Sequence, residues 1–392
     1  MKSILAVICI LGPAFSIAEA SASERRVGKL LIKTQTNTEV MYTLLNLAKT
    51  QRELRNWDKT PPMYAAVLRD FDPFQGHPAV KELEPGGKLA YDDGFSFDAF
   101  NDFPLHFSEL PEGRRIAAYG EKLLRRVPGG KNDAERAKIL DDYWEKIRDF
   151  YAASHFQDFL DKNKETYQSY IDDVYSSLPD FDAIGIQEDY HGHRGFDEFR
   201  LVPSPLALPQ GANYGGMIED SATHRKIAFN FMGIVEDEAA GRFGFRDKRT
   251  VEEMILHEFG HSFCNPVVDK HLAELEPFGF LFSGIAERMR RQAYSNWETV
   301  MRELLVRAVH SRYVLMKWGE EAAEKFLRED REDNQFVFID DFHRLLGDYE
   351  KQREKFMTLD EFFPILAKSL AGWGVYPMDV PSPLGLKKTM MT

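Results

Sequence analysis

The residues His257, Glu258 and His261 stand in the order His-Glu-x-x-His. On a helix, positions i and i+4 lie one turn apart on the same face, so both imidazoles can bind one metal ion. A catalytic zinc ion takes three protein ligands and leaves a fourth position open to water. Glu258 can take a proton from a water that the ion activates and later deliver it to a leaving group. This combination is typical of metallopeptidases.

A helix is needed to place these residues, and the surrounding sequence predicts one. Thr250 and Glu253 have capping-box spacing, so we expect the helix to start at Thr250. Apolar residues flank the motif and would bury the helix in the core. Upstream, residues 227–232 have strand character. We expect this segment to be an exposed edge strand that pairs with an extended peptide substrate.

A third metal ligand must come from outside the motif. The longer pattern HExxHxxGxxH is excluded, because its glycine and third-histidine positions hold Cys264 and Val267. A carboxylate is therefore expected. The downstream candidates are Glu274, Glu276, Glu287, Glu298 and Glu303.

Glu303 is the favoured candidate for the third ligand. Ser295 and Glu298 have capping-box spacing, which gives Glu298 a structural role at a helix start. Glu303 lies inside the apolar helix that follows, where an acid is rarely buried unless it is paired or bound to metal. The alternative is a salt bridge to Arg307. Arg307 and His310 share a face with Glu303 and are candidates for stabilising the transition state or supporting the ligands.

Other residues with possible chemistry have plainer interpretations. Residues 211–216 could form a turn that places Tyr214 near the cleft, but a surface turn is the more typical reading. His191 and His193 could form an auxiliary metal site, although exposed loop histidines are commoner. Cys264 is interpreted as a packed thiol, because nothing argues for a lowered pKa.

Most of the remaining sequence has helical patterns. Residues 36–39 have capping-box spacing and predict a helix start, as do residues 358–361. Residues 132–177 predict a long helix whose aromatic stripe belongs to the core.

A small sheet is predicted between about residue 181 and residue 234. Its predicted strands are residues 183–186, 199–202 and 226–232. We therefore expect an α+β, predominantly helical fold with a small sheet next to the HExxH helix.

The composition fits a globular, exported protein. The 392 residues are 43% hydrophobic and 29% charged, with a net charge of −13, which disfavours nucleic acid or an anionic membrane as partner. The first 22 residues resemble a signal peptide, with cleavage after Ala20 or Ala22; an N-terminal anchor is the alternative, but the apolar run is short. Cleavage would leave one cysteine, Cys264, and no segment able to span a membrane. We expect a periplasmic or secreted protein.

Three segments resemble a bacterial domain-of-unknown-function family of exported HExxH proteins. They are residues 257–266, 294–298 and 303–308, and the resemblance extends to His77-Pro78 and residues 150–159. The family is similar to the gluzincin class of zinc peptidases. This resemblance implies that His257, His261 and a glutamate bind the metal, with Glu303 in the matching Glu-x-x-x-Arg-Ala context. At Cys264 the family more often has an aliphatic residue.

The resemblance also implies a zincin-like core. We divide the chain into a signal peptide (1–22), a mainly helical N-terminal lobe (23–180), a zincin-like metal-binding lobe (181–380) and an irregular tail (381–392). The predicted function is that of an exported zinc-dependent hydrolase, most simply a metallopeptidase acting on a peptide or protein with one Zn²⁺. The rival hypotheses are a non-catalytic zinc-stabilised protein and a cell-envelope or carbohydrate-binding protein.

Overall fold

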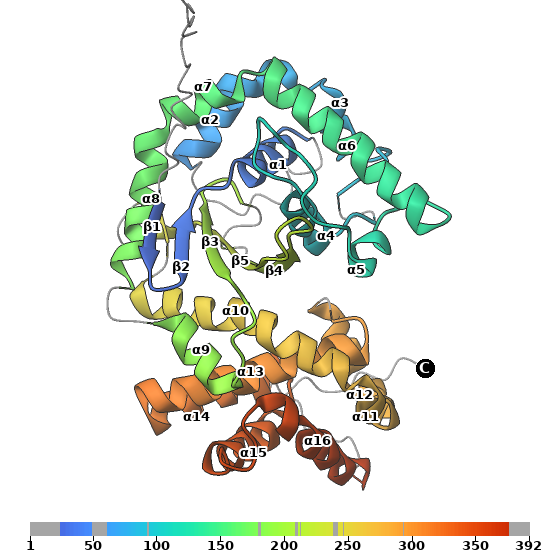
Figure 1. Cartoon of the computed structure of the whole chain (residues 1–392), viewed down its shortest axis with the longest axis vertical. Helices are drawn as coiled ribbons and strands as arrows, with labels where there is room; N and C mark the ends of the chain where they lie inside the picture. The colour runs from blue at the N-terminus through green and yellow to red at the C-terminus, as the bar shows by residue number, and fades with distance from the viewer. Residues whose placement is uncertain are drawn as a thin grey trace, which may run out of the picture.

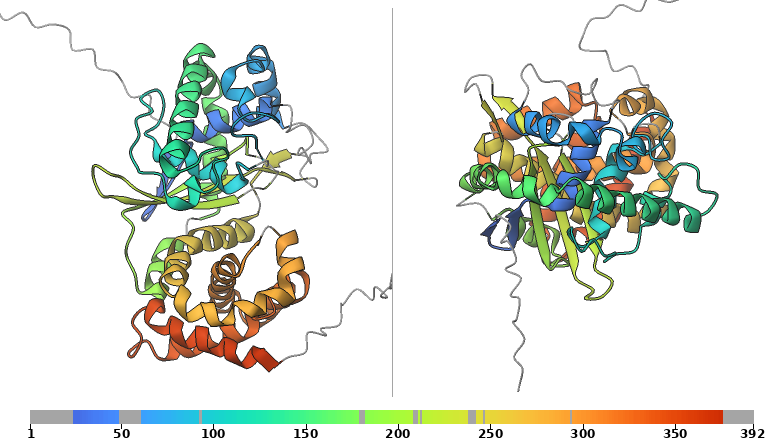
Figure 2. Two further views of the ribbon diagram at one scale, coloured as in Figure 1. Left: turned by 90° about the vertical axis from the view of Figure 1, so that its right-hand side faces the viewer. Right: turned by 90° about the horizontal axis from the view of Figure 1, so that it is seen from above.

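A computed structural model describes residues 24–48, 61–91, 94–178, 182–207, 211, 213–237, 242–245, 247–292 and 294–375. Helices predominate and the sheets are small, which confirms the expected α+β class. Figure 1 and the left view of Figure 2 show the sheet and helices α1–α8 above, and helices α9–α16 below. The predicted signal peptide and the predicted tail lie outside the described residues.

Within the described residues, the main sheet has five strands in the order β1-β2-β3-β5-β4. Strands β2, β3 and β5 are parallel, whereas β1 and β4 are antiparallel to their neighbours. A separate two-stranded ladder joins β6 to β7. The strands are β1 (Glu24–Val27), β2 (Leu30–Lys33), β3 (Glu198–Ser204), β4 (Asn213–Glu219), β5 (Lys226–Gly233), β6 (Val235–Asp237) and β7 (Arg242–Gly244).

The strand order corrects the predicted edge strand. Strand β5 contains the predicted residues 227–232, but it pairs with β3 on one side and β4 on the other, so it is central and buried. The edge is β4, a segment expected to be a surface turn. Its sequence Asn-Tyr-Gly-Gly has low strand propensity, and only its pairing with β5 makes it extended.

The upper helices cover the sheet on the side away from α10 (Figure 1). They are α1 (Thr36–Leu47), α2 (Pro62–Phe71), α3 (Pro78–Lys81), α4 (Phe97–Asp102), α5 (Glu121–Leu124), α6 (Asp133–Ala153), α7 (Phe156–Lys162) and α8 (Lys164–Ser176). The aromatic stripe lies in the core as predicted, with Phe150 and Phe156 fully buried. The predicted single helix is divided, because His155 adopts a left-handed conformation (φ 54°) and a second break follows at Asn163.

The lower helices pack around α10. They are α9 (Ala183–His191), α10 (Lys248–Lys270), α11 (Leu272–Leu275), α12 (Phe282–Arg291), α13 (Trp297–Trp318), α14 (Glu320–Arg328), α15 (Ile339–Lys351) and α16 (Leu359–Ser369), with a π-helical turn η5 (Glu329–Asp333) after α14. Residues 183–186, predicted as a strand, form the first turn of α9. The Asp182 side chain caps this helix by accepting from the Gly185 amide.

The helix starts agree with the sequence, but the capping residues mostly differ. Only the box at Thr358 and Glu361 is confirmed. Helix α10 is capped by Asp247 and helix α13 by Asn296, each one to three residues from the predicted cap. Helix α1 has no side-chain cap. Its Glu39 instead accepts a hydrogen bond from the Tyr167 hydroxyl.

The predicted boundary at residue 180 between two lobes stays a prediction. The main sheet takes β1 and β2 from the N-terminal side of this boundary and β3–β5 from the other side. Among the described residues, we find no helix that is both long and apolar enough to cross a membrane.

Candidate metal centre

Helices α10 and α13 form the frame of the site. They run antiparallel, because Lys317 pairs with Glu252 near one end and Arg302 pairs with Asp269 near the other. Between these ion pairs, Gly260 packs against Val306, and the missing side chain keeps the helices close. This packing brings the HExxH face of α10 opposite Glu303.

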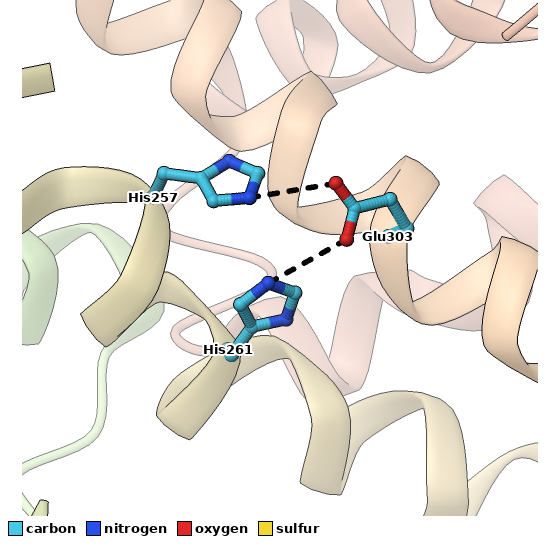
Figure 3. Close-up of side chains that lie close together, drawn as sticks. All are labelled: His257, His261 and Glu303. Carbon is cyan, nitrogen blue, oxygen red and sulfur yellow. Dashed lines mark ion pairs between the residues drawn. The ribbon is translucent and has the colours of Figure 1, made fainter. Parts of the chain in front are cut away.

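His257, His261 and Glu303 converge on one point between the two helices (Figure 3). The Nε2 atom of His257 lies 3.4 Å from Glu303 Oε1, and Nε2 of His261 lies 3.5 Å from Oε2. These separations are longer than a good hydrogen bond. Ligand atoms at zinc distances on the corners of a tetrahedron lie about 3.3–3.4 Å apart. Both separations are close to this value, and one ligand atom from each of the three residues lies within 4.8 Å of the others, so the group could hold a metal ion.

The charges at the cluster also suit a cation. Glu303 is 5% exposed. Burial raises its pKa, but Arg307 and the two histidines outweigh this and hold the pKa well below its usual value. Burial lowers the pKa of His261, and Glu303 offsets this effect only in part. For His257 the Glu303 charge outweighs burial and raises the pKa. The site thus presents an ionised carboxylate to two imidazoles.

Glu258 lies beneath the edge strand β4. A Cβ atom on Gly215 would lie 3.2 Å from the Glu258 carbonyl carbon and 3.3 Å from its Oε2, and closer still to the carbonyl oxygen. Only glycine permits this approach. Strand β4, which ends the described sheet order, therefore lies directly against the proposed base, in a segment where a turn was expected.

Arg307 contacts two carboxylates and one aromatic ring. Its Nε donates to Glu303 Oε1 at 2.7 Å, and an Nη donates to Asp330 Oδ1 at 2.6 Å. Its guanidinium also stacks on Phe336, 4.7 Å from the ring centre. Glu303 therefore makes the salt bridge considered as an alternative and also faces the histidines. Asp330 was missed in the sequence, because no local pattern links it to residue 307.

His310 lies beside the first histidine of the motif. Its ring centre is 6.0 Å from that of His257 and 4.8 Å from that of Phe326. It is 5% exposed, and within the described residues neither ring nitrogen has a hydrogen-bond partner. Burial lowers its pKa well below the usual value, so it is neutral.

The other candidates lie elsewhere. Of the remaining glutamates, Glu276 is exposed and the others form ion pairs or hydrogen bonds with residues outside the cluster: Glu274 with His271, Glu287 with Arg291 and Glu298 with Arg302. The ring of Tyr214 packs against those of Phe97 and Phe231.

The two histidines considered for an auxiliary site differ in burial. His193 is exposed, whereas His191 ends α9 and is buried, which lowers its pKa to about 3. Cys264 is packed and buried as predicted, and burial raises its pKa. In the part of the chain that the structure describes, only His257, His261 and Glu303 form a group able to hold a metal ion.

Comparison with known proteins places the chain in a family. No curated protein matches the sequence, and no solved structure matches it either. Residues 110–369 match the family described as Domain of unknown function (DUF4932), and this match covers more than half of the chain. The match contains α10 and α13, and with them the whole cluster. The chain therefore belongs to the DUF4932 family.

Proposed function

We propose that the protein is an exported, zinc-dependent hydrolase, and specifically a metallopeptidase with a gluzincin-like site. The observation that supports this most strongly is the placement of Glu258, which follows His257 of the three-residue cluster and lies against β4, the last strand in the described sheet order. A structural metal site has no use for a carboxylate base at its side.

Zinc is the ion that the donor set favours. Two imidazoles and one carboxylate are a set of three protein ligands found in catalytic zinc sites, which leave one position open. A bound zinc ion would supply Lewis-acid chemistry, activating water and polarising a carbonyl group. The three ligands would be His257, His261 and Glu303.

The remaining groups have roles that follow from their positions. Glu258 would accept the proton of the attacking water and return it to the leaving amine. Among the described residues, no strand pairs with the outer edge of β4, so an extended peptide could add to the sheet there. His310 remains a proposed transition-state or supporting group. Arg307 would support Glu303, because its guanidinium binds the carboxylates of Glu303 and Asp330.

Replacing Glu258 by Gln separates catalysis from metal binding. We expect the variant to bind zinc like the wild type and to lose peptide hydrolysis by at least about 100-fold. Glu253→Gln, which removes an ion pair with Arg249 on the same helix, is the control and should keep full activity. Hydrolysis of casein and of a mixed-peptide library can be followed by mass spectrometry. Unchanged hydrolysis in Glu258→Gln would contradict the proposed mechanism.

The rival is a zinc-stabilised, non-catalytic protein of the cell envelope. It predicts the same zinc content but no hydrolysis by wild type in any peptide pool. The export proposal has its own test: the N-terminal residue of protein recovered from the periplasm or the medium should follow Ala20 or Ala22.

A further inference from the structure

We propose that Asp330 is a positioning residue of the metal centre and acts on Glu303 through Arg307. This inference rests on the proposed function, because it concerns the same metal ligand. It assigns a role to a segment 27 residues beyond Glu303 in the chain.

Arg307 holds one oxygen of the metal ligand. Its Nε donates to Glu303 Oε1 at 2.7 Å, from one turn further along α13. Glu303 Oε1 also faces His257 at 3.4 Å. A carboxylate can rotate about its terminal bond, and a donor fixed at one oxygen removes that freedom. Arg307 therefore sets the direction in which Glu303 presents its oxygens to the histidines.

Arg307 is in turn held by Asp330. An Nη atom of Arg307 donates to Asp330 Oδ1 at 2.6 Å, so the two carboxylates bind different nitrogens of one guanidinium. Asp330 is 2% exposed. Asn334 donates to the same Asp330 oxygen at 2.9 Å, and the Phe336 amide donates to the Asp330 carbonyl at 2.8 Å. Asp330 is thus a fixed anchor and not a mobile surface charge.

The local backbone explains how Asp330 reaches this point. It belongs to the π-helical turn η5 (Glu329–Asp333), which follows α14. Such turns are rare and occur often at functional sites, because the wider turn changes the direction of its side chains. Here the turn η5 directs the Asp330 carboxylate toward Arg307 on α13.

The charges give Asp330 a second role. Arg307 is a permanent cation adjoining a site for a divalent cation, and alone it would repel the ion. Asp330 offsets that charge, and the ionised Glu303 then remains available to the metal. Without Asp330, the net charge of Glu303 and Arg307 together would be close to zero. With Asp330 the group carries a net negative charge, which favours binding of a cation more strongly.

The test is the zinc affinity of the mature full-length protein, measured by competition with a chromophoric chelator. Asp330→Asn keeps the shape and removes the charge, and we expect its zinc affinity to fall 10- to 100-fold, the usual cost of losing a partner of a metal ligand. The visible spectrum of bound Co²⁺ should also change. The control is Asp340→Asn, which removes an ion pair with Arg331 in the same turn. It should leave the affinity and the spectrum unchanged.

A double mutant shows whether Asp330 acts through Arg307. Arg307→Gln should weaken zinc binding by a similar factor, and the double mutant should be no weaker than Arg307→Gln alone. If Asp330→Asn does not fold, Asp330→Glu, which keeps the charge but displaces the carboxylate, takes its place in the affinity, spectral and double-mutant measurements. Wild-type affinity in the folded single mutants, or additive effects in the double mutant, would overturn the inference. A folded wild type without any zinc binding would instead overturn the proposed function.

Discussion

Gly215 is the point at which the sheet approaches the proposed base most closely, so Gly215→Ala tests the geometry of the site. The added Cβ atom would lie 3.2 Å from the backbone carbonyl carbon of Glu258 and nearer still to the carbonyl oxygen. It would also lie 3.3 Å from Oε2 of the Glu258 side chain. Backbone in the middle of a buried helix cannot rotate away as a side chain can. Either β4 or α10 must therefore move.

The size of this movement follows from contact distances. Unbonded heavy atoms pack at about 3.5–4.0 Å, so β4 and α10 must separate by about 1 Å. Overpacking of this kind costs about 1–3 kcal/mol of stability. A misplacement of about 1 Å at a reacting centre can reduce the rate about 100-fold. The proposed metal ligands lie on α10 and α13, which ion pairs join near both ends, so the two helices should move together and zinc content should not change.

The control is the next residue in the strand. A Cβ on Gly216 would meet side-chain atoms of Tyr214 at 2.8 Å and Leu105 at 3.0 Å, on the opposite face of β4. Gly216→Ala should therefore lose stability but keep its activity. We would compare peptide hydrolysis, zinc content and urea midpoints of both variants. Equal hydrolysis by Gly215→Ala and Gly216→Ala would refute the proposed contact between β4 and the base.

Two further predictions concern stability. Glu39 is fully buried, which raises its pKa to about 7 from 4.5 although the hydrogen bond from Tyr167 opposes the rise. The stability it contributes is therefore complete below about pH 4.5 and is lost as the pH rises to 7, a loss of about 3 kcal/mol. Glu39→Gln should flatten this part of the pH profile of urea unfolding, and an unchanged profile would contradict the assignment. Lys317→Met would leave Glu252, which is 3% exposed, without the partner at 2.5 Å, and should cost about 2 kcal/mol in urea unfolding. The exposed Lys325→Met control should change stability by less than about 0.5 kcal/mol, and equal effects of the two lysine variants would contradict the prediction.

The candidate metal-binding group could be predicted, because each of its residues stands in a recognisable local sequence pattern. His257 and His261 are one helical turn apart in any helix, and an acid inside the apolar pattern of α13 needs a partner. The antiparallel packing of α10 and α13 then brings Glu303 to the histidines. Asp330 had no such signal, because its contact with Arg307 depends on the path of the chain through α14 and η5.

The sheet was harder to predict for a physical reason. A strand is stabilised by partners distant in the sequence, so β4 forms in spite of its glycines. Residues 183–186 show the opposite error. A short apolar run fits a buried strand or a helix equally well, and here the Asp182 cap decides for the helix. The cap at Asp247 was likewise hidden by the capping-box spacing of Thr250 and Glu253.

The most direct test of the metal centre is the metal content of purified mature protein. Wild type, Glu303→Ala and Glu298→Ala would be dialysed against a weak chelator and measured by elemental analysis. We predict about one zinc ion per molecule in wild type and none in Glu303→Ala. Glu298→Ala should retain the ion, because residue 298 lies outside the candidate metal-binding group. A folded wild type without zinc, or a Glu303→Ala variant that retains it, would contradict the account.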